Sequence, residues 1–305
     1  MSTTKTGHID ARLTDVAVQY PQGAFAQSVL FPELPVMKGA DNYTVYNKLN
    51  LFQSPDDNIG KYSEANELKI SSTTATYSVK NRALKGFVSQ EDRDNYDSPL
   101  DAEIDETEAL VSAILNNREI RSQALAATIS LKSSPNTKWS AGGTPVKDIE
   151  TAIDAMFIKP NRAVISYPVW SVLKHHADLI ALYGGGNAAN KVLTTDMFAA
   201  IFGFEQVFVA TARKSTSKAA NAAALTYMWG KDMVMAYVAP NGSRKVPTFG
   251  RTFAQKLEGG PTFRTRKWKD EAKGIGGTDT IQVEHRSIEV VVAADAGYYL
   301  NDCIG

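Results

Sequence analysis

The sequence predicts an α+β protein with two globular parts and long extended segments. Three observations carry this prediction. Residues 98–129 have the pattern of one long helix, residues 139–240 alternate between helix and strand, and the segments on either side are typical of strands. A chain of 305 residues is also near the size at which one hydrophobic core tends to split into two.

Residues 1–42 predict an arm, not a domain. Their apolar side chains are scattered and are interrupted by Pro21, Pro32 and Pro35. Because these side chains have no local partners, we expect them to pack on another part of the chain or on another subunit.

Residues 43–90 predict a long β-hairpin. Two strand-like segments, NYTVYNKLNLF and ELKISSTTATYSVKNRALKGFVSQ, flank a polar loop, SPDDNIGKYSEAN. The hairpin has too few large apolar side chains for a core of its own. It therefore packs on its own domain or docks on a neighbouring subunit, and the pattern does not decide between the two.

Residues 91–138 contain the predicted long helix, 98–129. Ser98 and Pro99 are typical of a helix start, and Asp101 completes a capping box with Ser98. Acidic residues crowd the first turns and arginines come late, so the charges oppose the helix dipole. Apolar residues follow a stripe at three-and-four spacing: Ile104, Val111, Ile114, Leu115, Leu125 and Ile129. Such a helix is about 45 Å long, more than a compact domain of this size needs.

Residues 139–245 predict a compact α/β unit. Helices are expected at TPVKDIETAIDAMF, PVWSVLKHHADLIALYG and TTDMFAAIFG, and strands at NRAVISY, FEQVFVATA and AALTYMWGKDMVMAYVAP. The second helix begins at Pro168, ends at Gly184 and carries His175 and His176 late in its length.

The C-terminal part predicts strands again. Residues 246–290 are extended, and residues 291–305 contain a turn and a short final strand.

Patterns that mark catalytic, cofactor or metal sites are missing from the sequence. There is no phosphate-binding glycine loop after a strand, no H-E-x-x-H and no G-x-S-x-G. The four histidines do not cluster with carboxylates at ligand spacing. Cys303 is the single cysteine, which excludes an internal disulfide and favours a buried apolar role. No apolar run is long enough to cross a membrane. We therefore expect no enzyme activity and no cofactor.

The charges predict association with other copies of the chain. Lysines and arginines equal aspartates and glutamates in number, so the formal net charge is zero and self-repulsion is low. An acidic segment, 91–108, matches a basic segment, 251–273, and our hypothesis is that the two meet across a subunit contact. Reversal of Arg264 and Arg266 should then impair assembly and leave folding intact. The candidate contact residues are Lys61, Tyr77, Asp101, Glu103, Asp105, Glu106, Arg251, Arg264, Arg266, Lys267 and Lys269.

The order of these parts resembles the major capsid proteins of tailed double-stranded DNA phages, which have the Hong Kong 97-type fold. The resemblance covers nearly the whole chain. It is closest in NRAVISYPVWSVLKHH, MFAAIFGFEQVFVATA, YMWGKDMVMAYVAP with PTFGRTF, and EVVVAADAGYYLNDCI. These are patterns of apolar residues and turns, not a catalytic signature.

The resemblance implies a role for each segment. Residues 1–42 would be the N-arm, 43–90 the E-loop and 98–129 the spine helix. The peripheral domain would combine 91–138 with 246–290. The axial domain would be 139–245, to which 291–305 returns.

The resemblance also implies a virion protein that forms pentamers and hexamers, assembles in the host cytoplasm and closes an icosahedral shell around double-stranded DNA. Because the chain begins at the arm, a separate scaffolding protein is expected, together with a portal and possible decoration proteins.

Three other functions compete with this interpretation. The first is the shell of a nanocompartment that encloses a cargo enzyme. The second is an oligomeric α/β enzyme with a site near Trp170, His175 and Tyr183. The third is a DNA-binding protein that uses residues 251–273, which the neutral net charge disfavours.

Overall fold

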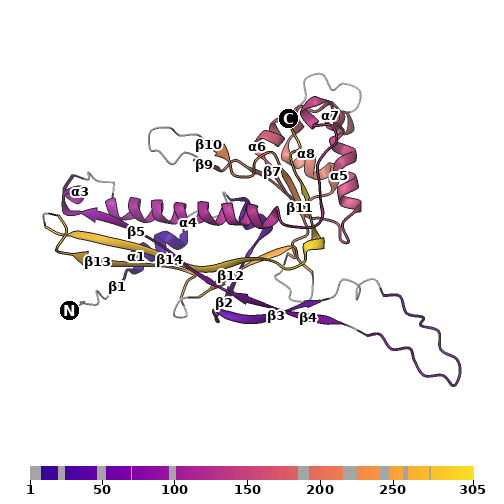
Figure 1. Ribbon diagram of the computed structural model, residues 1–305, viewed down its shortest axis with the longest axis horizontal. Helices are drawn as coiled ribbons and strands as arrows, with labels where there is room; N and C mark the ends of the chain where they lie inside the picture. Colours follow the sequence, from indigo (N-terminus) through magenta and orange to yellow (C-terminus); the bar gives the residue numbers. More distant parts are fainter. Residues whose placement is uncertain are drawn as a thin grey trace.

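The largest sheet of the computed structural model is six-stranded (Figure 1). The structure describes residues 8–19, 25–46, 53–69, 71–95, 101–184, 192–215, 225–240, 247–256, 260–274 and 276–305. The strands run in the order β1 (His8–Ile9), β13 (Phe263–Asp270), β14 (Thr278–Val291), β12 (Gly250–Gln255) and β2 (Glu33–Val36), and β5 (Lys80–Ser89) also pairs with β14. β14 joins the sheet together because it is long enough to pair with β13, β12 and β5.

Helix α4 (Ala102–Ala126) lies along one face of this sheet (Figure 1). Its 25 residues span about 38 Å. Leu110, Val111, Ile114 and Leu115 form its buried stripe and pack with apolar residues of β14 such as Ile281. The long helix predicted from the sequence is therefore confirmed, with ends a few residues inside the predicted range.

The cap of α4 differs from the prediction. Ser98 and Pro99 lie outside the described residues, and the N-cap is Asp101, whose carboxylate accepts the N–H groups of Glu103 and Ile104 at 2.9 and 3.3 Å. Asp101 is extended, with φ −136° and ψ 109°, as an N-cap residue is. The helix therefore starts later than the capping-box pattern indicates. A short helix, α3 (Gln90–Asn95), follows β5 and was not predicted.

The described part of residues 1–42 packs on its own chain. Helix α1 (Ala11–Gln19) buries Leu13 and Ala17 against α4 and β13. Helix α2 (Ala26–Leu30) is followed by Phe31, whose ring is also fully buried. The sequence left open whether the arm packs on its own chain or on another subunit, and for these residues the partner is the same chain.

The predicted hairpin forms between β3 (Ala40–Tyr46) and β4 (Ser72–Ser78), with Tyr43 opposite Ala75. Its base lies on β12, where the ring of Tyr77 stacks on Phe253 with centroids 4.3 Å apart. The described loop, residues 53–69, projects away from the body of the molecule (Figure 1). One expectation was wrong: the chain from residue 67 to 90 is not one hairpin strand, because β5 leaves the hairpin and pairs with β14.

A second sheet has five strands: β6 (Lys132–Ser133), β15 (Gly297–Leu300), β11 (Met233–Ala236), β7 (Arg162–Ser166) and β8 (Gln206–Ala210), in that order. Helices α5 (Pro145–Asp154), α6 (Tyr167–Leu173), α7 (Ala177–Gly184) and α8 (Thr195–Phe202) pack with one face of this sheet. A small hairpin, β9 (Arg213–Ser215) with β10 (Leu225–Tyr227), extends from the same unit (Figure 1). The predicted α/β unit and the returning C-terminal strand are both present.

The predicted helix from Pro168 to Gly184 is two helices. The chain turns at His175 and His176, so these residues do not lie late in a helix as expected. The carbonyl of Lys174 accepts the N–H of Leu193 at 3.0 Å, a tertiary bond made where the first helix stops.

The two sheets are joined by a shared apolar core. The other face of the five-stranded sheet presents Val164, Val234 and Ala236 to α2 and to the end of α4. Helix α2 therefore lies between α4 and the five-stranded sheet.

Candidate subunit-contact site

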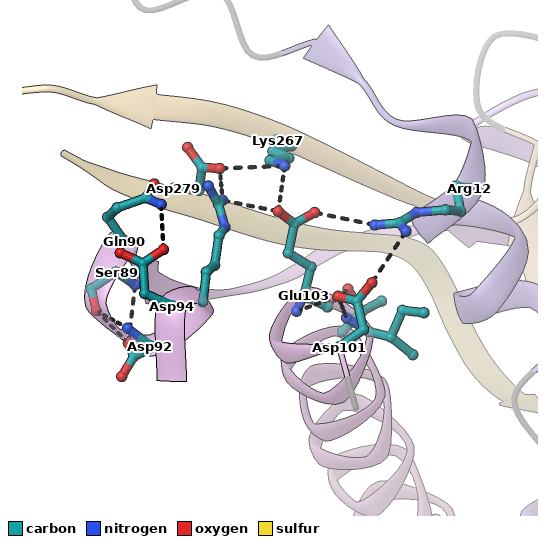
Figure 2. A network of polar contacts seen from close by, with 12 residues as sticks. Arg12, Ser89, Gln90, Asp92, Asp94, Asp101, Glu103, Lys267 and Asp279 are labelled. Carbon is teal, nitrogen blue, oxygen red and sulfur yellow. Dashed lines mark hydrogen bonds and ion pairs between the residues drawn. The ribbon is translucent and has the colours of Figure 1, made fainter. Parts of the chain in front are cut away.

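A charged cluster surrounds the start of α4 (Figure 2). Glu103 is at its centre and has an almost fully buried side chain. One of its oxygens, Oε1, accepts from Lys267 Nζ at 2.6 Å and lies 2.9 Å from Arg93 Nη2. The other, Oε2, accepts from Arg12 Nη2 at 3.3 Å. Glu103 thus connects α4 to α1, α3 and β13.

Two further carboxylates complete the cluster. Asp279 on β14 contacts Arg93 and lies 3.3 Å from Lys267 Nζ. Asp101 accepts from Arg12 Nη1 at 3.2 Å. Three cations therefore meet three carboxylates, and the charges balance. Each cation also touches two carboxylates, so the cluster fixes five elements relative to one another.

The surroundings of Asp101 shift the pKa of its carboxyl. Partial burial acts to raise the pKa of its carboxyl, but the N–H groups of Glu103 and Ile104 and the charge of Arg12 outweigh it. The pKa of Asp101 therefore lies below its ordinary value.

The acidic and basic segments do meet, but within one chain. Glu103 pairs with Lys267, and Arg264 and Arg266 pair with Glu284 on the neighbouring strand at 2.6 and 3.3 Å. The sheet register places Arg264 directly opposite Glu284. These residues therefore have partners within their own chain, and a contact between subunits stays a prediction for them. Because Arg264 is buried, its reversal should damage folding and could not isolate an effect on assembly.

The other candidate contact residues fall into two groups. Tyr77 and Arg251 are buried in their own chain. The second group is wholly or partly exposed: Lys61, Asp105, Glu106 and Lys269. For both groups a subunit contact stays a prediction. Glu106 lies over Gly86 of β5, where an added Cβ would come within 1.7 Å of its Oε1.

Sequence reasoning missed a second polar group in the middle of α4. Glu119 is fully buried and accepts Trp229 Nε1 at 2.6 Å, and Arg121 pairs with Glu289 on β14 at 3.2 Å. A signal was present. Glu119 follows Leu115 by four residues on the buried stripe, a position where a charged residue requires buried partners.

His285 was also left unassigned. Its ring is fully buried and stacks on Phe263 with centroids 4.1 Å apart. Burial and the charges of Arg118, Arg121 and Arg82 lower its pKa to about 3, so the ring is neutral at pH 7.

The structure places most of the positions considered for catalysis. Trp170 packs edge-on against Phe198 in the core beside α8, and Cys303 is buried. His175 is exposed in the turn between α6 and α7, and the side chain of Tyr183 lies outside the description. Within the described ranges no group of three His, Cys, Asp or Glu side chains could hold a metal ion, and no helix there is long and apolar enough to span a membrane.

Three exposed large apolar side chains lie close together in sequence, in the loop between β3 and β4. Ile59, Tyr62 and Leu68 are 52, 92 and 54% exposed. Lys61 lies beside Tyr62, with its Nζ 5.6 Å from the ring centroid. We call residues 53–69 the hairpin loop.

The chain is similar to known proteins along almost its whole length, although no family model matches it. It is 25% identical over 313 residues to the major capsid protein of Pseudomonas phage JBD67, which covers 97% of both chains. A crystal structure of a phage-related protein from Bordetella bronchiseptica RB50 matches with a TM-score of 0.74 and 22% identity, covering 98% of both chains. A putative capsid protein of an Escherichia coli CFT073 prophage matches with a TM-score of 0.56 and 13% identity, covering 98% of this chain and all of that one.

The fold is also found in an encapsulin. The SrpI encapsulin from Synechococcus elongatus PCC 7942 matches with a TM-score of 0.51 and 13% identity, over all of this chain and 92% of that one. The chain thus has the Hong Kong 97-type fold. Over almost its whole length the chain is also similar in sequence to a phage major capsid protein.

Proposed function

We propose that copies of this chain assemble as pentamers and hexamers into an icosahedral shell that encloses phage double-stranded DNA. The observation that carries the proposal is the hairpin loop, which presents Ile59, Tyr62 and Leu68 to solvent away from every core of its own chain. Exposed apolar groups gathered on one projecting segment are typical of a contact with another molecule.

The energy available from the hairpin loop is substantial. Burying one large apolar side chain contributes about 1.5–3 kcal/mol, and these three are at least half exposed. Allowing for the surface already buried, each docked loop would contribute about 3–5 kcal/mol before the loss of loop freedom. A closed shell repeats this contact at every subunit, so a modest local energy is enough to stabilise the whole particle.

Each segment has a proposed role in the shell. Residues 1–42 act as the N-arm, 43–90 as the E-loop that reaches a neighbouring subunit, and α4 as the spine helix of the peripheral domain. The unit 139–245 with 291–305 forms the axial domain at the centre of each capsomer. The charged contact candidates that lie exposed or partly exposed, apart from the ion pairs at the start of α4, are Lys61, Asp105, Glu106 and Lys269.

The proposed partners are further copies of the chain, a separate scaffolding protein, a portal and possible decoration proteins. DNA is enclosed without sequence-specific binding, which the zero net charge supports because a general nucleic-acid binder carries a basic surface. The encapsulin likeness favours a second candidate, a shell around a protein cargo. Measurement of nucleic acid and foreign protein inside purified particles separates the two.

A triple substitution tests the proposal. Ile59→Ser, Tyr62→Ser and Leu68→Ser together should leave the circular dichroism of the monomer unchanged, because the loop contacts no core, and should abolish particle formation. The matched control is Gln53→Ala with Asn58→Ala in the same loop, which keeps the apolar side chains.

Assembly is measured by sedimentation velocity and negative-stain microscopy, with the chain expressed alone and with its genomic neighbours. The unsubstituted chain should give closed shells, tubes or capsomer rings. A chain that stays monomeric under every condition, with a scaffolding protein present, would refute the proposal.

A further inference from the structure

One carboxylate joins three parts of the chain. Glu119 Oε1 accepts the N–H of Ala26 at 3.0 Å and Trp229 Nε1 at 2.6 Å, and Oε2 accepts the N–H of Gln27 at 2.9 Å. Ala26 and Gln27 open α2, and Trp229 lies in the turn before β11. A side chain of α4 therefore holds both the arm helix and the unit built on the five-stranded sheet.

The arm helix contacts both sides of this junction. Its Val29 carbonyl accepts Arg162 Nη1 of β7 at 2.8 Å, and Val29, Leu30 and Phe31 share the core cluster of Val164. Helix α2 thus packs between α4 and the five-stranded sheet and contacts both.

Neighbouring positions of α4 make polar contacts with both sheets. Arg118 lies 3.1 Å from Glu33 of β2, and Gln123 donates to the hydroxyl of Tyr299 of β15 at 3.2 Å. The positions from Arg118 to Gln123 therefore hold the arm, the six-stranded sheet and the five-stranded sheet together.

The Glu119 carboxylate cannot easily lose one of its donors. It is fully buried, and burial raises the pKa of this carboxyl although the N–H groups of Trp229, Gln27 and Ala26 act in the opposite direction. Withdrawal of either the arm helix or the Trp229 turn would leave a buried charge with fewer hydrogen bonds, which is strongly unfavourable. Each group therefore stabilises the position of the other.

We infer that Glu119 is a coupling residue that makes the docking of arm helix α2 and the seating of the Trp229 turn cooperative. A partner that displaces the arm would loosen the axial domain from α4, and a movement of the axial domain would release the arm. This device lies in the subunit itself and does not depend on the proposed shell.

Amide hydrogen exchange at Ala26 and Gln27 measures directly how firmly α2 is held by Glu119. These first-turn N–H groups have no acceptor within their helix, and among the described residues their acceptor is Glu119. The test uses the full-length chain, with exchange resolved to single residues and all variants in the same assembly state.

Trp229→Phe removes one donor from the five-stranded side and keeps an aromatic ring. We expect exchange at Ala26 and Gln27 to accelerate about tenfold or more, because a hydrogen bond to a charged group has been lost from their common acceptor. The matched control is Trp139→Phe, since the indole of Trp139 is also buried and donates to a carboxylate, that of Asp148, at 2.8 Å. The control should not change exchange at α2.

Glu119→Gln decides whether the coupling passes through the carboxylate or through packing. In the Glu119→Gln background, Trp229→Phe should add little further exchange at Ala26 and Gln27. An equal increase in both backgrounds would assign the coupling to packing and overturn the inference. If the Glu119→Gln variant does not fold, the Trp229→Phe variant alone provides the test. Faster amide exchange confined to residues 228–234 in that variant would overturn the inference. Neither result bears on whether shells form.

Discussion

Replacement of Glu103 by alanine removes the central carboxylate of the cluster in Figure 2. Lys267, Arg93 and Arg12 are then left with two carboxylates, so the cluster gains one uncompensated positive charge. Removal of one partner from a fully buried ion pair costs about 3–5 kcal/mol, and from a surface pair about 0–1 kcal/mol.

The exposure of the cluster places the expected loss between these limits. The side chain of Glu103 is 10% exposed, those of Arg93 and Lys267 are 28 and 27% exposed, and that of Arg12 is 58% exposed. We expect the free energy of unfolding to fall by about 2–3 kcal/mol, of which the lost helix-dipole interaction supplies about 0.5 kcal/mol.

Urea unfolding followed by tryptophan fluorescence measures this loss, because Trp268 is next to Lys267 on β13. Asp105→Ala is the matched control: Asp105 lies in the same first turn and is exposed, and the ion pairs of the cluster are made by other residues. Both substitutions remove a first-turn carboxylate, and Asp105→Ala gains only a few tenths of a kcal/mol more helix propensity, so a difference of about 2 kcal/mol between them reports the cluster.

Salt provides a second reading of the same experiment. At 1 M NaCl the screening length is about 3 Å, so the contribution of the exposed Arg12 should shrink and that of the buried pairs should remain. A Glu103→Ala variant as stable as Asp105→Ala, in low and high salt, would refute the view that the cluster stabilises the fold.

Two further predictions concern close packing and pH. Gly250→Ala should destabilise the chain by about 1–3 kcal/mol in urea unfolding, because the added Cβ would lie 2.4 Å from the Phe31 ring, and Phe31→Leu should partly restore it. Asp101→Asn keeps the helix cap and loses the charge. Because the folded pKa of Asp101 is depressed, its contribution is complete above the unfolded pKa, about 3.9, and disappears as pH falls through the folded pKa. Stability of the variant should therefore fall less than that of the unsubstituted chain between pH 6 and 2, and parallel curves would contradict this.

The elements of the fold were largely predictable because their signals are local. The stripe of Val111, Ile114 and Leu115 has helical spacing, and it faces the core in the structure. The alternation of helix and strand between residues 139 and 245 likewise marked the five-stranded unit. The single helix predicted from Pro168 to Gly184 was wrong because a tertiary contact replaces a helical one. The carbonyl of Lys174 accepts the N–H of Leu193 where the first helix ends.

The candidate contact site was only partly predictable. The sequence showed that the two charged segments are complementary, but complementarity does not say whether the partner is the same chain or another copy. That depends on sheet register and on the position of α4, which place Glu103 beside Lys267 and Arg264 beside Glu284. For the hairpin, the sequence predicted only that it has too few large apolar side chains for a core of its own; the exposure of Ile59, Tyr62 and Leu68 came from the structure.

By itself, the sequence determined the α+β class, the long helix, the hairpin and the returning strand, because periodicity and turn residues act over a few neighbouring positions. Only the tertiary structure decided which distant groups meet: the arm on its own chain, β5 on β14, and Glu119 between Ala26 and Trp229. The physical reason is that a buried charge is tolerated only where several donors converge on it, and those donors come from segments about 90 and 110 residues away in the chain.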